Sequence, residues 1–197
     1  MTTIVAIDPG ASGGFAVMSF GKTFCLGMPA TQGDLLALIR ELKATADLEG
    51  ADTVCVLEEV NGFVGKAQPG SAMFKFGEHY GFIKGVVQTL GIRLVLVRPQ
   101  VWQKYYSLGT ASRCASKTEW KNKLKAEAQR RFPQLTVTLA TADALLILEW
   151  ALQGNHILAP TATGHFTPIE MNFPADAEKP PRNAGGNNKT KSESKKV

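Results

Sequence analysis

The sequence predicts an α/β domain with a mixed sheet of five strands flanked by helices. Three short apolar runs near the N-terminus are joined by glycine-containing turns, a spacing typical of an antiparallel meander. Two later apolar runs alternate with segments of helical periodicity. The predicted strands are residues 4–7, 14–20, 23–28, 52–58 and 93–97.

The predicted helices are marked by apolar spacing along one face and by breakers at their ends. Leucine and isoleucine recur at helical spacing in the first helix, and Pro99 opens a short helix after the fifth strand. Pro133 and Gly154 end the last two helices. The helices are residues 33–46, 71–90, a short segment through 101–105, 117–132, and a final one that begins near Thr141.

A stripe of glycines runs along the second predicted helix, which follows a glycine-rich loop at residues 61–70. Gly77, Gly81 and Gly85 are four residues apart and therefore lie on one helix face. Such a stripe lets another backbone approach closely. Packing against a neighbouring helix or the sheet is the simplest interpretation, and the same helix is the candidate dimer interface.

The regular pattern ends near residue 155, which predicts one domain over residues 1–155. Residues 156–173 are an irregular extension punctuated by proline. Residues 174–197 are polar and rich in glycine, asparagine and lysine, so we expect a disordered basic tail that cannot bury enough apolar area to fold.

Neither a signal-peptide pattern nor an apolar run of ~18 residues is present, so we expect a cytoplasmic protein without a membrane partner. The three cysteines Cys25, Cys55 and Cys114 are odd in number and widely spaced. This fits neither a disulfide framework nor paired zinc ligands, and structural thiols are the preferred interpretation.

Positive charge is concentrated in two stretches of a chain whose net charge is +5. Residues 113–131 carry a local charge of +5 and residues 174–197 a local charge of +3, which leaves the remainder at −3. This asymmetry favours a polyanionic partner such as nucleic acid.

Three carboxylates are placed where elements of the predicted sheet begin or end. Asp8 closes the first strand before a Pro-Gly turn, Glu58 closes the fourth, and Asp143 opens the last helix. Taken alone, Asp8 is also explained as a turn-capping residue and Asp143 as a charge favoured by the helix dipole. Together they predict a site for a divalent metal ion at one edge of the sheet.

The order of the elements, with acids on the first strand, the fourth strand and the last helix, resembles the ribonuclease H-like fold. At the motif level the chain resembles the RuvC-type Holliday-junction resolvases, particularly their phage and viral relatives, over roughly residues 4–150. The motifs are Ile-Asp-Pro-Gly at 7–10, Leu-Glu-Glu-Val at 57–60, Phe-Lys-Phe-Gly at 74–77 and Ala-Asp-Ala-Leu-Leu at 142–146, with weaker matches at 98–102 and 131–133.

The resemblance implies a homodimeric endonuclease that depends on Mg²⁺, with Mn²⁺ able to substitute, and that nicks four-way or other branched DNA symmetrically. A virus-encoded enzyme of this kind works in the host cytoplasm and needs no small-molecule cofactor. Asp8, Glu58 and Asp143 are then the catalytic metal ligands, since hard cations prefer carboxylate oxygens. The neighbouring Glu59 points to the opposite face of its strand. His79 and His156 receive no catalytic role.

One position departs from the family pattern. RuvC-type enzymes usually carry a further acid three or four residues before the one that matches Asp143, and this chain has Leu139 and Ala140 there. Glu149 lies about 240° further round an ideal helix and cannot replace it. Three interpretations stay open: a natural three-acid site completed by water, a weakened or retuned resolvase, or a variant inactivated to hold DNA uncut.

DNA contacts are expected to be mainly to phosphate, because a junction is recognised by its shape and backbone path. Lys117, Lys121 and Lys125 recur at helical spacing and predict a basic ridge, although a solvated helix face would look similar. An aromatic side chain could wedge between bases at the crossover. The predicted DNA contacts are Phe63, Lys66, Phe74, Lys84, Lys104, Lys117, Lys121, Lys123 and Lys125.

Two other functions fit parts of the sequence. An actin-like sugar or acetate kinase also carries an Asp-x-Gly loop, here followed by Ser12 and Gly13, but such kinases usually need a second domain of similar size. A non-catalytic DNA-binding protein of the same fold is the other, and Ala140 is its best support.

Overall fold

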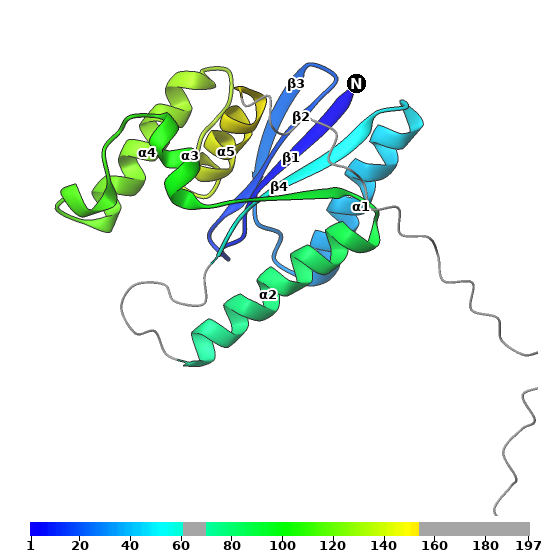
Figure 1. Cartoon of the computed structure of the whole chain (residues 1–197), viewed down its shortest axis with the longest axis horizontal. Helices are drawn as coiled ribbons and strands as arrows, with labels where there is room; N and C mark the ends of the chain where they lie inside the picture. The colour runs from blue at the N-terminus through cyan, green and yellow to red at the C-terminus, as the bar shows by residue number, and fades with distance from the viewer. Residues whose placement is uncertain (61–69, 154–197) are drawn as a thin grey trace, which may run out of the picture. The chain divides into compact units, whose positions relative to one another are not determined.

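The computed structural model describes residues 1–60 and 70–153. Every predicted strand and helix is present, with ends that differ by at most a few residues. In order, the elements are β1 (Thr2–Asp8), β2 (Gly14–Ser19), β3 (Lys22–Gly27), α1 (Gln32–Leu48), β4 (Asp52–Glu58), α2 (Gly70–Thr89), β5 (Arg93–Val97), α3 (Pro99–Tyr105), a 3-10 turn (Ala111–Arg113), α4 (Lys117–Arg131) and α5 (Ala142–Gln153), as Figure 1 shows.

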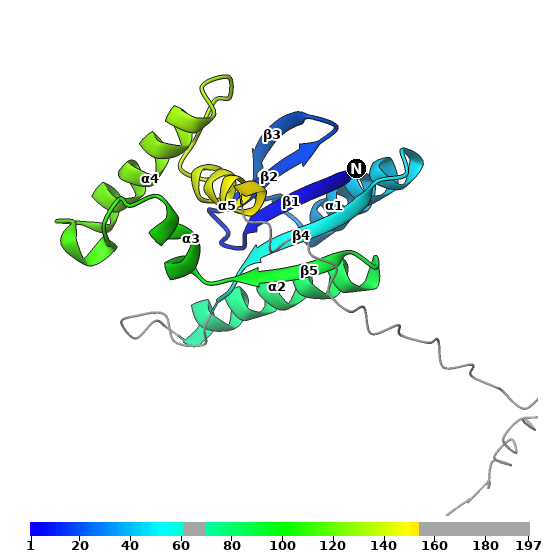
Figure 2. The ribbon, with the colours of Figure 1, turned by 45° about the horizontal axis from the view of Figure 1, so that its top comes forward.

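The five strands form one mixed sheet in the order β3-β2-β1-β4-β5, which Figure 2 displays from edge to edge. The first three strands are an antiparallel meander, because β2 pairs antiparallel with both β1 and β3. β4 pairs parallel with both β1 and β5. This topology confirms the predicted α/β fold with a five-stranded mixed sheet flanked by helices.

Alternate residues of the central strand enter two separate cores. Ile4 and Ala6 of β1 face a core shared with α3, α4 and α5, whereas Val5 and Ile7 face a core shared with α1 and α2. Because both faces are covered, β1 is buried along almost its whole length, with an apolar run from Ile4 to Ile7. The first polar side chain after this run, Asp8, therefore stands at the strand end.

Helix α5 is the most deeply buried helix of the domain. Eight of its residues are buried, including the consecutive run from Leu145 to Leu148. Figure 2 shows it lying over the sheet, with α4 on its outer side. A helix that is apolar all round has neighbours on every side, so the position of its first turn is firmly fixed.

Arg131 connects α4 with α5 and with Tyr106 at the end of α3. Its guanidinium donates to Glu127 at 2.7 Å and to Glu149 of α5 at 3.0 Å, and it lies 4.8 Å from the ring centroid of Tyr106. The Tyr106 hydroxyl in turn donates to the carbonyl of Leu146. This network braces α4 and the end of α3 against α5.

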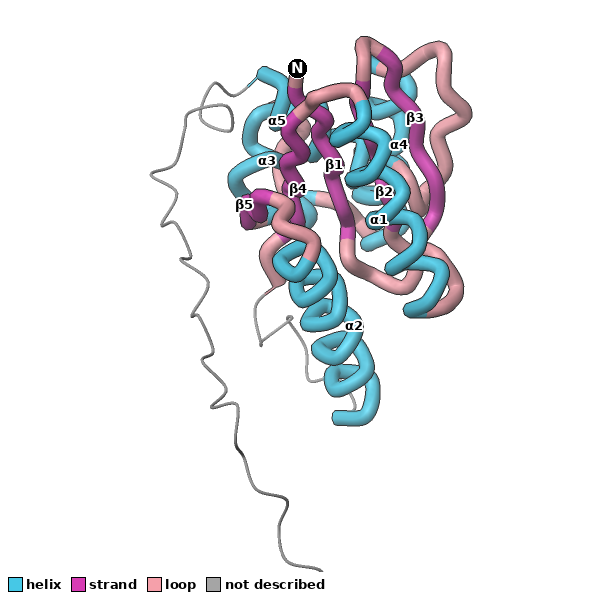
Figure 3. Tube along the Cα trace, turned by 90° about the vertical axis from the view of Figure 1, so that its right-hand side faces the viewer, coloured by secondary structure: helices cyan, strands magenta, loops and turns pink. Residues whose placement is uncertain are grey.

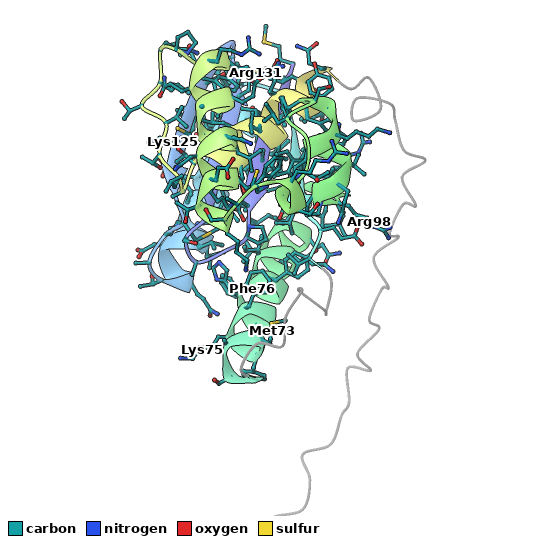
Figure 4. The ribbon with its side chains drawn as sticks, turned by 90° about the vertical axis from the view of Figure 1, so that its left-hand side faces the viewer. Met73, Lys75, Phe76, Arg98, Lys125 and Arg131 are labelled. Atoms are coloured by element: carbon teal, nitrogen blue, oxygen red, sulfur yellow. The ribbon has the colours of Figure 1, made fainter. Side chains whose placement is uncertain are left out.

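Helix α2 is supported along only half of its length. Its buried residues, Ile83, Val86 and Val87, all lie in the C-terminal half. The N-terminal half extends past the sheet, as Figure 3 shows, and Figure 4 marks Met73, Lys75 and Phe76 along it. The side chain of Phe74 in this half is 75% exposed.

The glycine stripe of α2 is open in the part of the chain that the structure covers. A Cβ built on Gly77, Gly81 or Gly85 would have no heavy atom within 4 Å. The interpretation that the stripe packs within the domain is therefore wrong for residues 1–60 and 70–153. Among the described residues, the stripe is an exposed backbone surface on which another molecule could pack.

Several predicted features lie outside the described residues. These are most of the loop with Phe63 and Lys66, the extension over 156–173 with His156, and the tail over 174–197. Among the helices that are described, none is both long enough and apolar enough to traverse a bilayer.

Candidate functional site

Asp8 and Glu58 end two neighbouring parallel strands on the same side of the sheet. β1 and β4 pair in register, with Ile7 beside Leu57, so the residues that follow these two lie side by side. Side chains alternate along a strand, and Ala6 and Val56 face the core that contains α5. Asp8 and Glu58, two residues further on, share that face.

Asp143 reaches the same place from above the sheet. It lies in the first turn of α5 and is only 5% exposed. Its charge raises the pKa of both Asp8 and Glu58, which places all three carboxylates within electrostatic range of one another. Three acids that are 50 and 85 residues apart in sequence therefore meet at one rim of the sheet.

Burial and mutual repulsion make these acids hard to ionise. Burial is the largest influence on Glu58, followed by the charges of Asp8 and Asp143, and together they raise its pKa to about 8. The pKa of Asp8 is also raised, first by burial and then by Asp143. A cation among these acids would favour their ionised forms.

Each carboxylate has one oxygen engaged and one left over. The backbone N–H of Gly10 donates to Oδ1 of Asp8 at 3.2 Å. The indole N–H of Trp102 donates to Oε2 of Glu58 at 2.9 Å. Oδ2 of Asp143 accepts from the Lys121 ammonium. Its Oδ1 is buried without any hydrogen-bond partner among the described residues.

The side chain of Lys121 points toward the acid cluster and not outward from α4. Its ammonium forms an ion pair with Asp143. Burial alone lowers the pKa of this lysine, but the surrounding carboxylates outweigh burial and raise the net pKa, Asp143 more than Asp8 or Glu58. Lys121 is thus engaged at the site, and its predicted contact with phosphate stays a prediction.

Two glycines allow the chain to pass close to the acids. A Cβ on Gly13 would lie 2.4 Å from the carbonyl oxygen of Asp8 and 2.7 Å from its Cγ. A Cβ on Gly14 would lie 2.9 Å from the carbonyl oxygen of Ala140. Real Cβ atoms are not found at such distances, so both positions require glycine.

Ala140 lies beside the site, in the turn before α5 and not in the helix itself. Its methyl group is 4.0 Å from the place where a Cβ on Gly27 would stand. The position expected to hold a further acid is therefore next to the ends of β2 and β3, and it contributes no carboxylate.

The donor set suits a hard divalent cation such as Mg²⁺. Carboxylate oxygens are its preferred protein ligands, and the orphaned Oδ1 of Asp143 is a buried acceptor without a partner. Within residues 1–60 and 70–153, no three His, Cys, Asp or Glu side chains stand close enough to hold one ion. Cation binding therefore requires the carboxylates to turn toward a common point.

The other candidate acids and histidine have separate surroundings. Glu59 accepts from the Arg98 guanidinium at 3.0 Å, outside the acid cluster. Glu149 belongs to the Arg131 network. Nε2 of His79, on α2, is buried without a hydrogen-bond partner in the part of the chain that is described.

The remaining predicted DNA contacts are spread over three helices. Lys117 and Lys104 are exposed, Lys125 is half-buried, and Figure 4 shows Lys125 on α4. Lys123 pairs with Glu119 at 3.0 Å. Lys84 of α2 lies 5.5 Å from the ring centroid of Tyr80. Lys121, which lies between Lys117 and Lys125 on α4, pairs with Asp143.

Comparison with known proteins finds matches among solved structures alone, at low sequence identity. No protein-family model and no curated protein sequence matches the chain significantly. Among solved structures, the chain is similar to Thermus thermophilus RuvC in complex with a Holliday junction substrate, with a TM-score of 0.48 and 12% identity. A second Thermus thermophilus RuvC structure gives a TM-score of 0.47 and 14% identity. Each alignment covers 77% of this chain and 95% of the other.

Sequence reasoning missed Trp102 and the inward turn of Lys121. Trp102 follows β5 on the short helix that Pro99 opens, and its position in the Arg-Pro-Gln-Val-Trp segment was the only signal that it approaches Glu58. For Lys121 the regular lysine spacing pointed outward. The buried partner at Asp143 overrides that pattern.

Proposed function

We propose that this chain is a divalent-metal-dependent endonuclease of the RuvC type that cuts four-way and other branched DNA. One observation carries the proposal: Asp8, Glu58 and Asp143, from three separate elements, converge at one rim of the sheet, with a buried carboxylate oxygen left unpartnered. The motif resemblance at residues 7–10, 57–60 and 142–146 supports it.

The chain's own residues would hold and orient the reacting groups. Asp8, Glu58 and Asp143 are the proposed metal ligands, and Mg²⁺ or Mn²⁺ would activate water and stabilise the leaving oxygen. Trp102 fixes the Glu58 carboxylate, and Gly10 does the same for Asp8. The buried surroundings exclude bulk water from the carboxylates and strengthen their hold on a cation.

Branched DNA is the proposed substrate because several lysines lie on the helices that flank the acids. Lys117, Lys123 and Lys125 of α4 and Lys104 of α3 are proposed to contact phosphates. Phe74 is proposed as an aromatic contact, and Phe63 and Lys66 remain predictions outside the described residues. Each phosphate contact should steepen the loss of affinity with added salt.

A homodimer is part of the proposal, since two symmetric nicks need two symmetric sites. The open stripe of α2 supports this, because Phe74, Gly77, Gly81 and Gly85 share one exposed helix face. An apolar hollow of about 290 Å³ between α1 and α2 adjoins it and is lined partly by Leu36, Phe82 and Leu90.

The test is cleavage of a labelled four-way junction in Mg²⁺ or Mn²⁺. The wild-type chain is expected to nick it, and Asp8→Asn, Glu58→Gln and Asp143→Asn to lose at least 100-fold in rate while still binding. Glu59→Gln is the matched control for Glu58→Gln, because its carboxylate pairs with Arg98 outside the cluster. It should cut normally.

A non-catalytic branched-DNA-binding protein is the second candidate, favoured by the alanine at position 140. The same assay separates the two candidates. If neither the wild-type chain nor Ala140→Asp cuts the junction while both bind it, the protein is a binder. Cleavage by Ala140→Asp alone would indicate an enzyme inactivated at that position.

A further inference from the structure

Lys121 is the one described cation that enters the acid cluster. Its ammonium pairs with Oδ2 of Asp143, and its charge also acts on Asp8 and Glu58, lowering the pKa of each. The lysine side chain is 45% exposed, whereas the Asp143 side chain is 7% exposed. The lysine therefore reaches inward from the surface to a buried partner.

The charges at this site balance in a specific way. A bound divalent cation favours the ionised form of all three carboxylates, which then carry −3; the Lys121 ammonium reduces this to −2, and the cation neutralises the remainder. A second divalent cation would leave an excess of +2 at a buried site, and uncompensated buried charge is unfavourable. A fourth carboxylate would reduce this excess, but position 140 holds alanine.

The hydrogen bonds agree with this count. One oxygen of each acid is engaged, by Gly10, Trp102 and Lys121 respectively. The second oxygen of each, Oδ2 of Asp8, Oε1 of Glu58 and Oδ1 of Asp143, accepts no hydrogen bond from the described residues. Three free oxygens are enough for one ion completed by water, because Mg²⁺ usually keeps several water ligands.

We propose that the Lys121 ammonium stands in for a second divalent cation, so that each chain binds one metal ion at Asp8, Glu58 and Asp143. Lys121 is then a charge-balancing residue that holds one oxygen of Asp143 and leaves the other for the ion. The inference rests on the proposed metal-dependent function of this site, and it adds the number of ions and the identity of the second positive charge.

Titration of the full-length chain with Mn²⁺, without DNA, tests this by calorimetry and by the electron paramagnetic resonance signal of free Mn²⁺. The wild-type chain should bind one ion. Lys121→Met removes a repelling charge and should bind one ion about tenfold more tightly. Lys121→Glu supplies a fourth carboxylate at a position whose side chain reaches Asp143, and it should bind two ions.

Lys43→Met is the matched control, because Lys43 forms a Lys–Asp ion pair with Asp47 on α1, away from the acids. It should leave Mn²⁺ binding unchanged. Lys121→Arg keeps the charge and should stay within threefold of the wild-type affinity. The inference is overturned if the wild-type chain binds two ions or none, or if Lys121→Met binds Mn²⁺ with unchanged affinity. The number of ions bound by the wild-type chain tests the inference even if a variant fails to fold.

Junction cleavage, measured separately, distinguishes failure of this inference from failure of the proposed function. One ion per chain with the predicted Lys121 effects, but no cleavage, supports the charge-balancing role and rules out the proposed nuclease activity. Cleavage with two ions bound to the wild-type chain supports the proposed nuclease activity and rules out the charge-balancing role of Lys121.

Discussion

Trp102 and Glu58 are joined by a 2.9 Å hydrogen bond from the indole N–H to the carboxylate, across 44 residues of sequence. The tryptophan is a residue of α3 and is fully buried, so its donor has no alternative partner in water. This bond favours the ionised form of Glu58, opposing the effect of burial on its pKa. A residue of the core thus orients a residue of the candidate site.

Trp102→Phe should therefore reduce cleavage by about 10- to 100-fold, the range typical when a hydrogen bond behind a metal ligand is removed. The unfolding free energy should fall by about 1–3 kcal/mol from lost volume and the lost bond. Junction cleavage and urea denaturation measure the two effects. Trp120→Phe, in the same core, should lose stability but keep its rate within about threefold. Equal rate losses in both variants would contradict the positioning role.

Gly13→Ala should displace the Asp8 carboxylate, because the added Cβ would stand 2.7 Å from Cγ of Asp8. We expect a loss of about 2 kcal/mol or more in unfolding free energy, since overpacking forces the backbone to shift, together with loss of metal binding. Gly10→Ala is the control, as its Cβ would meet nothing nearer than 3.6 Å. Circular dichroism melts and Mn²⁺ titration check both, and a well-tolerated Gly13→Ala would be inconsistent with this geometry.

Metal removal should make stability depend on pH through Glu58. Its pKa rises from an ordinary value of 4.5 to about 8 in the folded chain, chiefly through burial. Between these values the folded state binds more protons than the unfolded state, so stability falls as pH rises.

In EDTA, Glu58→Gln should therefore stabilise the protein, and the gain should grow by more than about 1 kcal/mol between pH 5 and pH 9. Urea denaturation at the two pH values measures this gain. Glu59→Gln, the neighbouring control, should show no such trend. A gain in Glu58→Gln that is the same at both pH values would rule out the buried, hard-to-ionise carboxylate.

Gly81→Leu should disrupt the proposed homodimer without harming the fold. Nothing lies within 4 Å of a Cβ at this position, so the side chain fits in the single chain. If a second copy packs on the stripe, leucine blocks its approach and light scattering should report a monomer. Lys75→Leu, about 120° round the helix from Gly81, is the control and should remain dimeric. A wild-type monomer, or a dimeric Gly81→Leu, would contradict this interface.

Much of the fold could be predicted because local patterns and packing agree. Apolar runs separated by glycine turns predicted all five strands. Side chains alternate along a strand, so Asp8 lies on the same face as Ala6, and Glu58 on the same face as Val56. Both depend only on the period of a strand. The helix breakers Pro99 and Pro133 placed the boundaries of α3 and α4 in the same way.

What could not be predicted depends on contacts between distant elements. The spacing of Lys117, Lys121 and Lys125 describes one helix, and it carries no information about the carboxylate of Asp143 packed beside it. The glycine stripe was likewise assigned to packing within the chain, although no described residue covers it. Helical period identifies a face but not what lies against that face.

Asp143 enters the site only when α5 docks over β1, the last of the described elements in the chain to do so. Contacts between residues this far apart in sequence form late, because a long loop must close before they are gained. A growing polypeptide that has not yet released α5 from the ribosome would have Asp8 and Glu58 without their third partner. The proposed cutting activity would then be withheld until synthesis of the domain is complete.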